Sequence, residues 1–175
     1  MEVDTKNDFP AVEVDKPGDK WRWVAASDGY IPDGALLGGE DVNGEPLFVC
    51  RSLHAHKGET HKLPGKLVPT HKVCYVAFKG KEIAKRKYQV LVAEKGLKWK
   101  DAPKGRWCEN AVIGGEKHSG EPLLIGRTWY HSTHTEPSLV IGYFDKEETL
   151  LRCPFGGNEI TSHNYEYLAL ESDDN

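Results

Sequence analysis

WVAASDGYIPDGALLGGEDVNGEPLFVCR, residues 23–51, aligns without gaps on WKDAPKGRWCENAVIGGEKHSGEPLLIGR, residues 99–127, at an offset of 76 residues. Twelve of the 29 aligned pairs are identical, among them Trp23/Trp99, Gly39/Gly115 and Arg51/Arg127. Beyond them, after one extra residue in the second copy, the match resumes with Phe78, Gly80, Glu82, Ile83 and Tyr88 on Phe155, Gly157, Glu159, Ile160 and Tyr165. Each copy exceeds the typical solenoid period of roughly 20–50 residues, so the sequence predicts a duplicated half-domain about a pseudo-twofold axis.

Each copy predicts strands. Short runs rich in β-branched and aromatic residues follow Gly-Glu-Pro turns or precede Gly turns, at 47–53, 73–78 and 88–92 and at 123–129, 150–155 and 165–169. No segment of helical length has a convincing 3.6-residue period. The sequence therefore predicts an all-β fold in which two tandem repeats, 21–95 and 96–170, form a pseudo-twofold antiparallel β-sheet or sandwich. Residues 1–20 are polar and acidic and are expected to be disordered, and the tail 171–175 is expected to fray.

Composition and charge narrow the functional classes. The net charge of -4 argues against a general attraction to nucleic acid or anionic membranes, and no stretch reaches the roughly 20 apolar residues of a membrane span. The first residues are acidic where a signal peptide carries basic and then apolar residues, so the sequence predicts a cytoplasmic protein, with export by an unconventional route left open. Four cysteines, Cys50, Cys74, Cys108 and Cys153, lie in the chain, and we expect reduced thiols that pack in the core.

One repeated pattern resembles a known family. The string from Trp23 through Ile31-Pro32-Asp33, Gly39, Asp41 and Leu47-Phe48-Val49 to Arg51, followed by Pro64-Gly65-Lys66 and Phe78-Lys79-Gly80-Lys81-Glu82, is similar to the DM9 repeat. DM9 repeats usually occur in pairs, and the resemblance extends over almost the whole of residues 21–170. It implies a compact antiparallel β-structure of two pseudo-symmetric repeats and a homodimer.

The resemblance also implies a function and a site. Some DM9 proteins are mannose-binding lectins that recognise microbes in invertebrate innate immunity, and they hold the sugar with an Asp and a Lys of one repeat. These positions correspond to Asp41 and Lys66, so mannose or mannose-containing glycans are the expected partners, and no cofactor is implied. An ionised carboxylate accepts from sugar hydroxyls and an ammonium group donates to them, which suits this pair. The second copy departs from the pattern, because Lys117 stands at the position of Asp41.

Other constellations favour weaker hypotheses. His54, His56, His61 and His71 gather in one region, and a His-x-His pair on a strand can hold zinc, although no second tight pair completes the site. Lys79, Lys81, Lys85, Arg86 and Lys87 form a basic run that the second copy lacks. This run leaves an alternative open, an intracellular interaction or scaffold protein that binds a protein or an anionic lipid. The common nucleotide-binding and hydrolase motifs are absent from the sequence, and we expect no catalysis.

Overall fold

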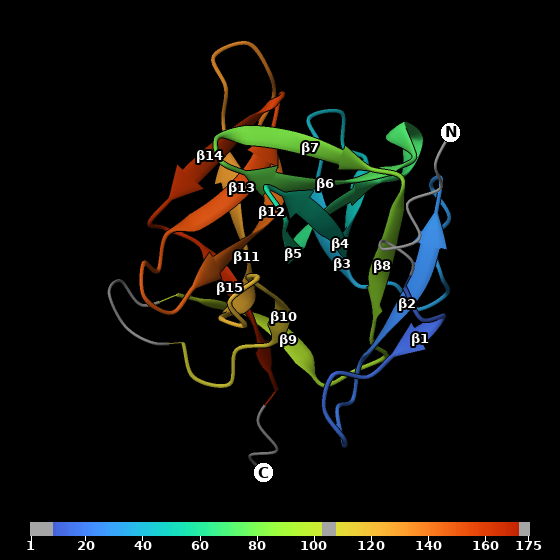
Figure 1. The fold of residues 1–175 in the computed structure, drawn as a ribbon. Coiled ribbons are helices and arrows are strands. Elements are labelled where there is room, and N and C mark those ends of the chain that lie inside the picture. The colour runs from blue at the N-terminus through green and yellow to red at the C-terminus, as the bar shows by residue number, and fades with distance from the viewer. Residues whose placement is uncertain (1–8, 103–107, 172–175) are drawn as a thin grey trace.

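The regular secondary structure is almost entirely strand, as the computed structural model, which describes residues 9–102 and 108–171, shows (Figure 1). The strands are β1 (Val12–Glu13), β2 (Arg22–Ser27), β3 (Leu37–Glu40), β4 (Pro46–His56), β5 (Glu59–Val68), β6 (Val73–Phe78), β7 (Lys81–Lys85), β8 (Lys87–Val92), β9 (Leu97–Asp101), β10 (Ile113–Glu116), β11 (Pro122–Tyr130), β12 (Ser138–Asp145), β13 (Leu151–Phe155), β14 (Asn158–Ser162) and β15 (Glu166–Leu170). One 3-10 turn, η2 (Pro69–His71), is the exception within the described chain. The predicted all-β fold is confirmed.

The strands form one antiparallel sheet that closes on itself. Eight strands make a ring in the order β3, β4, β5, β6, β7, β14, β13 and β12, and β12 pairs again with β3. β8, β2 and β1 continue outward from β4. β11 pairs with β12 of the ring, and β15 and β9 continue outward from β11. Closure leaves few free edges among the described strands, since in residues 9–102 and 108–171 an edge remains only where these extensions end.

The two repeats are interleaved and complete one barrel together. β3 of the first repeat pairs with β12 of the second at Glu40 and Leu139, and β10 of the second pairs with β5 of the first at Glu116 and Lys62. Gly39 allows the first approach, because a Cβ there would clash with the backbone carbonyl of Leu139. Its counterpart Gly115 would clash with the carbonyl of Lys62 in the same way. The Gly-Gly identity between the copies therefore reflects the contact between repeats.

Two arginines, the buried Arg51 and the partly exposed Arg127, bind the repeats to each other. The Arg51 guanidinium lies 4.0 Å from the centroid of the Trp23 ring and donates to the Gly114 carbonyl of the second repeat. Arg127 lies 4.2 Å from the Trp99 centroid and donates to a backbone carbonyl of the first repeat. Because Trp and Arg are identical in both copies, the same cation–π contact forms twice across the pseudo-twofold axis.

The segment before the first repeat is ordered where the structure describes it, and the expectation of disorder for residues 1–20 is wrong for residues 9–20. β1 pairs with β2 through Val12 and Glu13. Glu13 and Asp15 both form salt bridges to Arg51, at 3.1 Å and 2.8 Å. Residues 11–15, which we call the N-terminal arm, are held against the sheet because the buried Arg51 guanidinium requires counter-charges. Residues 1–8 and 172–175 lie outside the described residues.

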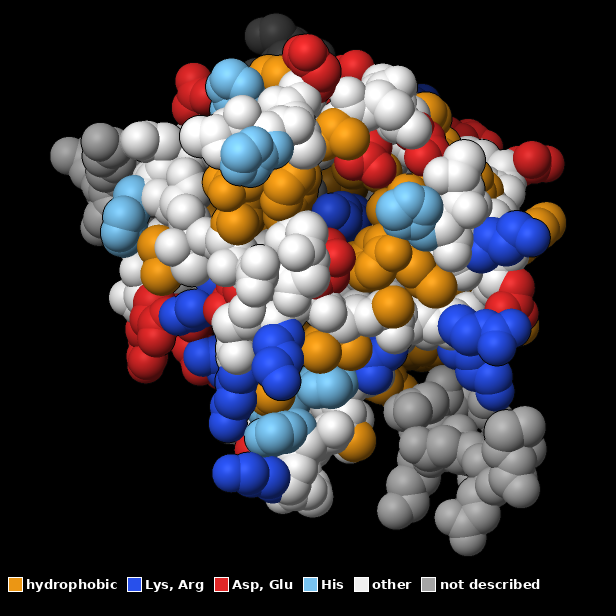
Figure 2. Space-filling model, turned by 90° about the horizontal axis from the view of Figure 1, so that it is seen from above, with side chains coloured by type: hydrophobic (Ala, Val, Ile, Leu, Met, Phe, Trp, Pro, Cys, Tyr) orange, Lys and Arg blue, Asp and Glu red, His pale blue; other side chains and the backbone are white. Residues whose placement is uncertain are grey.

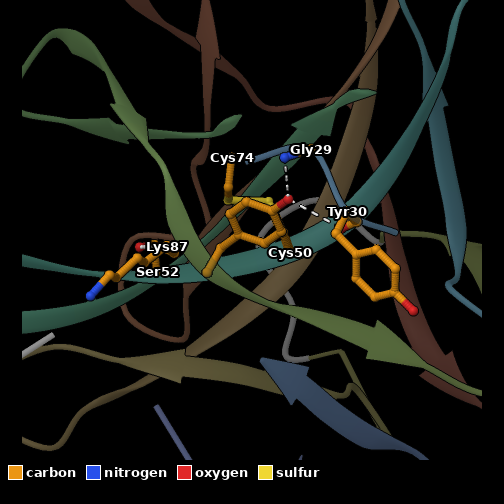
Figure 3. Close-up of a disulfide and its surroundings, with 7 residues drawn as sticks. Gly29, Tyr30, Cys50, Ser52, Cys74 and Lys87 are labelled. Atoms are coloured by element: carbon orange, nitrogen blue, oxygen red, sulfur yellow. Dashed lines mark hydrogen bonds between the residues drawn. A yellow bond between two sulfur atoms is a disulfide. The ribbon is translucent and has the colours of Figure 1, made fainter. Parts of the chain in front are cut away.

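The cysteines require a second correction. Cys50 of β4 and Cys74 of β6 form a disulfide in the core, so the expectation of reduced thiols is wrong for this pair (Figure 3). No sequence pattern predicts this bond, because the two residues are 24 positions apart and come together only when β4 and β6 both pair with β5. Beside the disulfide, the buried Tyr88 hydroxyl accepts from the Gly29 N–H and donates to the Tyr30 carbonyl. Cys108 and Cys153 are free and buried, as expected for thiols that pack in the core.

Candidate functional site

Lys66 lies on β5 inside the barrel wall, with only 5% of its surface exposed. Its Nζ is 3.3 Å from Oε2 of Glu82, and it lies over two aromatic rings, 5.6 Å from the Tyr75 centroid and 5.3 Å from the Phe155 centroid. Tyr75 is the cross-strand partner of Lys66 on β6. Phe155 belongs to the second repeat, so both repeats build the surroundings of this ammonium group.

Glu82 joins the two hairpins that meet at the pseudo-twofold axis. Its Oε1 accepts from the Gly157 N–H at 3.1 Å, and Glu159 accepts from the Gly80 N–H at 3.0 Å in return. The hairpin tips thus fix each other, and the second oxygen of Glu82 remains directed at Lys66. This carboxylate is only 11% exposed, so its charge depends on the ammonium group for compensation.

Asp41 begins the tight turn between β3 and β4. Its N–H donates to the Glu45 carbonyl, and its Oδ1 accepts from the Val42 N–H at 2.8 Å. Gly44 closes the turn at a φ of 84°, which favours glycine. Asp41 therefore caps its own turn, and in the described chain the ion pair of Lys66 is with Glu82 and not with Asp41.

Tyr75 connects the two expected site residues. Burial raises the pKa of its hydroxyl, and the negative charges of Glu82 and Asp41 raise it further, so both carboxylates lie in its neighbourhood. The hydroxyl also forms a 2.9 Å hydrogen bond with Nδ1 of His71, which is exposed. Asp41 and Lys66 thus both lie near Tyr75, and no ion pair joins them among the described residues.

This cluster combines chemistry that polyhydroxy ligands use. It offers an ammonium donor, carboxylate acceptors, and aromatic faces, on which the apolar face of a sugar ring packs. Sequence analysis identified Asp41 and Lys66 but missed Tyr75, Glu82 and Phe155 as members of the same cluster. A signal existed for the last two, because Glu82 and Phe155 each have an identical counterpart in the other copy.

The same positions in the second repeat hold different groups. Tyr143 takes the place of Lys66, and its hydroxyl donates to the Ala77 carbonyl. Arg152, the cross-strand partner of Tyr143, lies 3.4 Å from Glu159 and 2.7 Å from Glu148. Lys117, at the position of Asp41, pairs with Asp145 at 3.0 Å and Glu121 at 3.2 Å.

The predicted histidine cluster forms around an aromatic ring. The rings of His54, His56 and His61 lie 4.6, 5.2 and 5.3 Å from the Phe78 centroid, and His71 lies apart with Tyr75. Within the described ranges, no three His, Cys, Asp or Glu side chains are arranged to hold a metal ion. Burial lowers the pKa of His54 to about 4, and the nearby Lys85, His56 and His61 add to this.

The surface near β7 and β14 is mixed in character. Figure 2, viewed from that side, shows hydrophobic side chains exposed between basic, acidic and histidine side chains. From the basic run, Lys79 lies over the Phe78 ring and Arg86 pairs with Asp28 at 2.8 Å. A separate cavity of about 440 Å³ lies under the N-terminal arm, where Glu13, Lys62 and Trp21 line it with others.

Comparison with protein families gives one matching family. The DM9 repeat family matches residues 7–59 and 55–136. This chain belongs to the DM9 repeat family. The two matches meet in the β4–β5 hairpin, whereas the internal alignment starts each copy at Trp23 and Trp99, so the boundaries 21–95 and 96–170 stay a prediction.

A solved structure shares the fold of this DM9 protein. The nematode sperm cell motility protein MFP2B is similar over 100% of this chain and 53% of its own, with a TM-score of 0.57 and 14% sequence identity. The chain thus spans about half the length of that protein, and the likeness concerns the fold alone. Comparison with curated proteins gives no match. Among the described residues, no helix has the length and apolar character needed to cross a membrane.

Proposed function

We propose that this DM9 protein is a carbohydrate-binding protein of the mannose type, which recognises glycans on microbial surfaces in innate immunity. The observation that carries the proposal is the Lys66 ammonium group held between the rings of Tyr75 and Phe155, with Glu82 beside it. Lys66 is buried and its geometry is fixed by these contacts, so little side-chain entropy is lost when it donates to a ligand.

Asp41 supplies the acceptor in this proposal. Its Oδ1 is used by the turn, and Oδ2 is the oxygen that we assign to a sugar hydroxyl. The half-buried Tyr75 and the exposed His71 form the rim between Asp41 and Lys66. A contact set of this size gives weak affinity per site, and a homodimer with two such sites would raise the avidity for a glycan surface.

The test is a calorimetric titration of mannose, with galactose as the control sugar. We expect mannose-selective heat from the wild type, and loss of that heat in Asp41→Asn and Lys66→Met. Asp33→Asn and Lys81→Met are matched controls, because both residues are exposed and lie outside the cluster. Circular dichroism confirms the fold of each variant. Absence of heat with every sugar, or equal heat in the site variants, would contradict the proposal.

A further inference from the structure

The two ends of the sheet differ in one respect. β2 and β9 occupy equivalent places in the repeats, with Trp23 on one and Trp99 on the other. β2 lies between β8 and β1, whereas β9 pairs with β15 on one side and with no strand of residues 9–102 and 108–171 on the other (Figure 1). β9 is therefore an edge whose backbone groups can accept another strand.

The backbone of β9 presents its donors to that edge. On β2, the Ala25 N–H donates to the Ala11 carbonyl of the N-terminal arm at 2.9 Å. The equivalent residue on β9 is Asp101. The Ala102 N–H donates to the Tyr165 carbonyl on the β15 side, at 3.0 Å. Since backbone direction alternates along a strand, the N–H groups of Trp99 and Asp101 point to the open side.

The N-terminal arm shows what such an edge binds. Glu13 and Asp15 direct their carboxylates at Arg51, which stacks on Trp23. Val12 and Val14, in contrast, are 54% and 50% exposed. Recognition of the arm therefore rests on backbone pairing and on two acidic residues separated by one residue. The valine side chains next to these acidic residues are not selected by burial.

The second repeat has the same stacked arginine without the arm, and Glu166, at the position of Gln89, pairs with Arg127 at 3.0 Å. Arg127 stacks on Trp99 as Arg51 does on Trp23, but its side chain is 19% exposed, compared with 1% for Arg51. The register that pairs Val12 with Val24 on β2 would place the corresponding residue of a ligand opposite Lys100, because Lys100 is the equivalent of Val24. An acidic residue there would form a cross-strand ion pair.

We propose that the free edge of β9 binds an extended acidic segment of a partner protein, which adds as an antiparallel strand and directs two carboxylates at Arg127. The mode is strand addition to a sheet edge, with main-chain hydrogen bonds for affinity and the basic side chains for specificity. The arm of a second copy is not the occupant, because Glu13 and Asp15 already neutralise a buried arginine that would lose its counter-charges.

A peptide copied from the N-terminal arm of this protein can test the proposal. A fluorescent peptide with the sequence of residues 9–16, FPAVEVDK, is titrated with the intact protein, and binding is followed by anisotropy. We expect saturable binding that weakens with salt and is lost with the Glu13→Gln, Asp15→Asn peptide. A peptide with Val12→Glu should bind roughly one and a half- to fivefold more tightly, as expected for one cross-strand ion pair.

Two protein variants and one mapping experiment locate the complex. Arg127→Gln should weaken binding at least about tenfold. Lys100 is a half-buried residue on the edge strand. In Lys100→Glu, the Val12→Glu peptide should bind more weakly than the unchanged peptide, which is the reverse of the order expected for the wild type. Hydrogen exchange should slow at the amides of Trp99 and Asp101 when peptide binds. Failure of the peptide to bind, unchanged exchange at these amides, or concentration-dependent self-association that protects them without peptide would each overturn the proposal.

Discussion

The candidate site and its counterpart in the second repeat use the same residue types at exchanged positions. In the first repeat, β5 supplies the cation Lys66 and β6 the aromatic Tyr75. In the second, β12 supplies the aromatic Tyr143 and β13 the cation Arg152. Glu82 and Glu159 each face the cation of their own repeat, so the barrel requires a counter-charge at both hairpins but not from a particular strand. Both repeats thus have a cation, and the first repeat differs in that its cation, Lys66, lies over two aromatic rings.

The two arginines at the outer strands give a second comparison. Arg51 has five polar contacts through its three nitrogens, to Gln89, Asp15, Glu13 and the Gly114 carbonyl. Arg127 has contacts to Glu166 and to the Gly38 carbonyl. The difference is due to the N-terminal arm, which has no equivalent among the described residues of the second repeat. Identical residues in duplicated halves can thus have unequal roles when one added segment covers only one of them.

The largest expected difference between the repeats follows from this inequality. Arg51→Leu should lower the free energy of unfolding by about 3–5 kcal/mol, because it leaves Glu13 and Asp15 without a buried partner. Arg127→Leu removes fewer bonds from a more exposed side chain and should cost about 1–2 kcal/mol. Urea denaturation measures both, with Arg86→Leu as an exposed control. Equal losses would show that the arm contributes nothing to the role of Arg51.

The next largest difference in stability concerns the disulfide of the first repeat. In the second repeat, an aliphatic side chain occupies the place of the disulfide. The equivalents of Cys50 and Cys74 are Gly126 and Leu151, and Leu151 packs against Gly126. Reduction should lower the stability by about 3 kcal/mol, as a loop of this length predicts. The double variant Cys50→Gly, Cys74→Leu should be insensitive to reductant and recover part of that loss. Thermal melts with and without reductant test this, and a wild-type melting temperature that reductant leaves unchanged would contradict the expectation.

Removal of the cation of the first site has a smaller effect that depends on Glu82. Lys66→Met should destabilise the protein by about 2–3 kcal/mol at pH 7, since the Glu82 carboxylate stays buried without a counter-charge. Lys66→Met combined with Glu82→Gln should restore much of the loss. A double-mutant cycle in urea measures the coupling. Additive losses would mean that the two side chains do not depend on each other.

The smallest effect is a pH dependence confined to the first repeat. The folded-state pKa of His54 is about 4 and its unfolded value is about 6.5, so the unfolded chain binds the proton between these values and stability falls as the pH decreases from 6.5 toward 4. After allowance for solvent screening, we expect about 1–2 kcal/mol. The equivalent residue is Tyr130, whose ring contacts Phe155 as His54 contacts Phe78.

His54→Tyr, which installs this counterpart, should flatten the stability profile between pH 7 and pH 5. Urea unfolding at several pH values measures the slope, and exchange of the exposed His163 for Tyr serves as the control. An unchanged slope in His54→Tyr would assign the pH dependence to other groups.

The predicted localisation, homodimer and sugar specificity stay predictions, and each depends on surroundings outside one chain. The family is shown, and it was recognisable from the spacing of Trp23, the Gly-Gly pair and Arg51 in two copies. The candidate residues could be named from sequence because the motif fixes their positions. Their neighbours could not be named, because Phe155 reaches Lys66 only through the interleaving of the repeats.

The sequence by itself determined that the chain is a duplicated all-β structure, since periodicity, turn residues and internal identity are local properties. Only the tertiary structure decided that Glu82 belongs with Lys66, that Cys50 and Cys74 join, and that the acidic residues 13 and 15 are ordered against Arg51. These contacts join residues distant in sequence, and the closure of the barrel and the crossing of strands between repeats bring them together. A pattern along one chain does not contain that curvature, because it arises from the packing of all the strands at once.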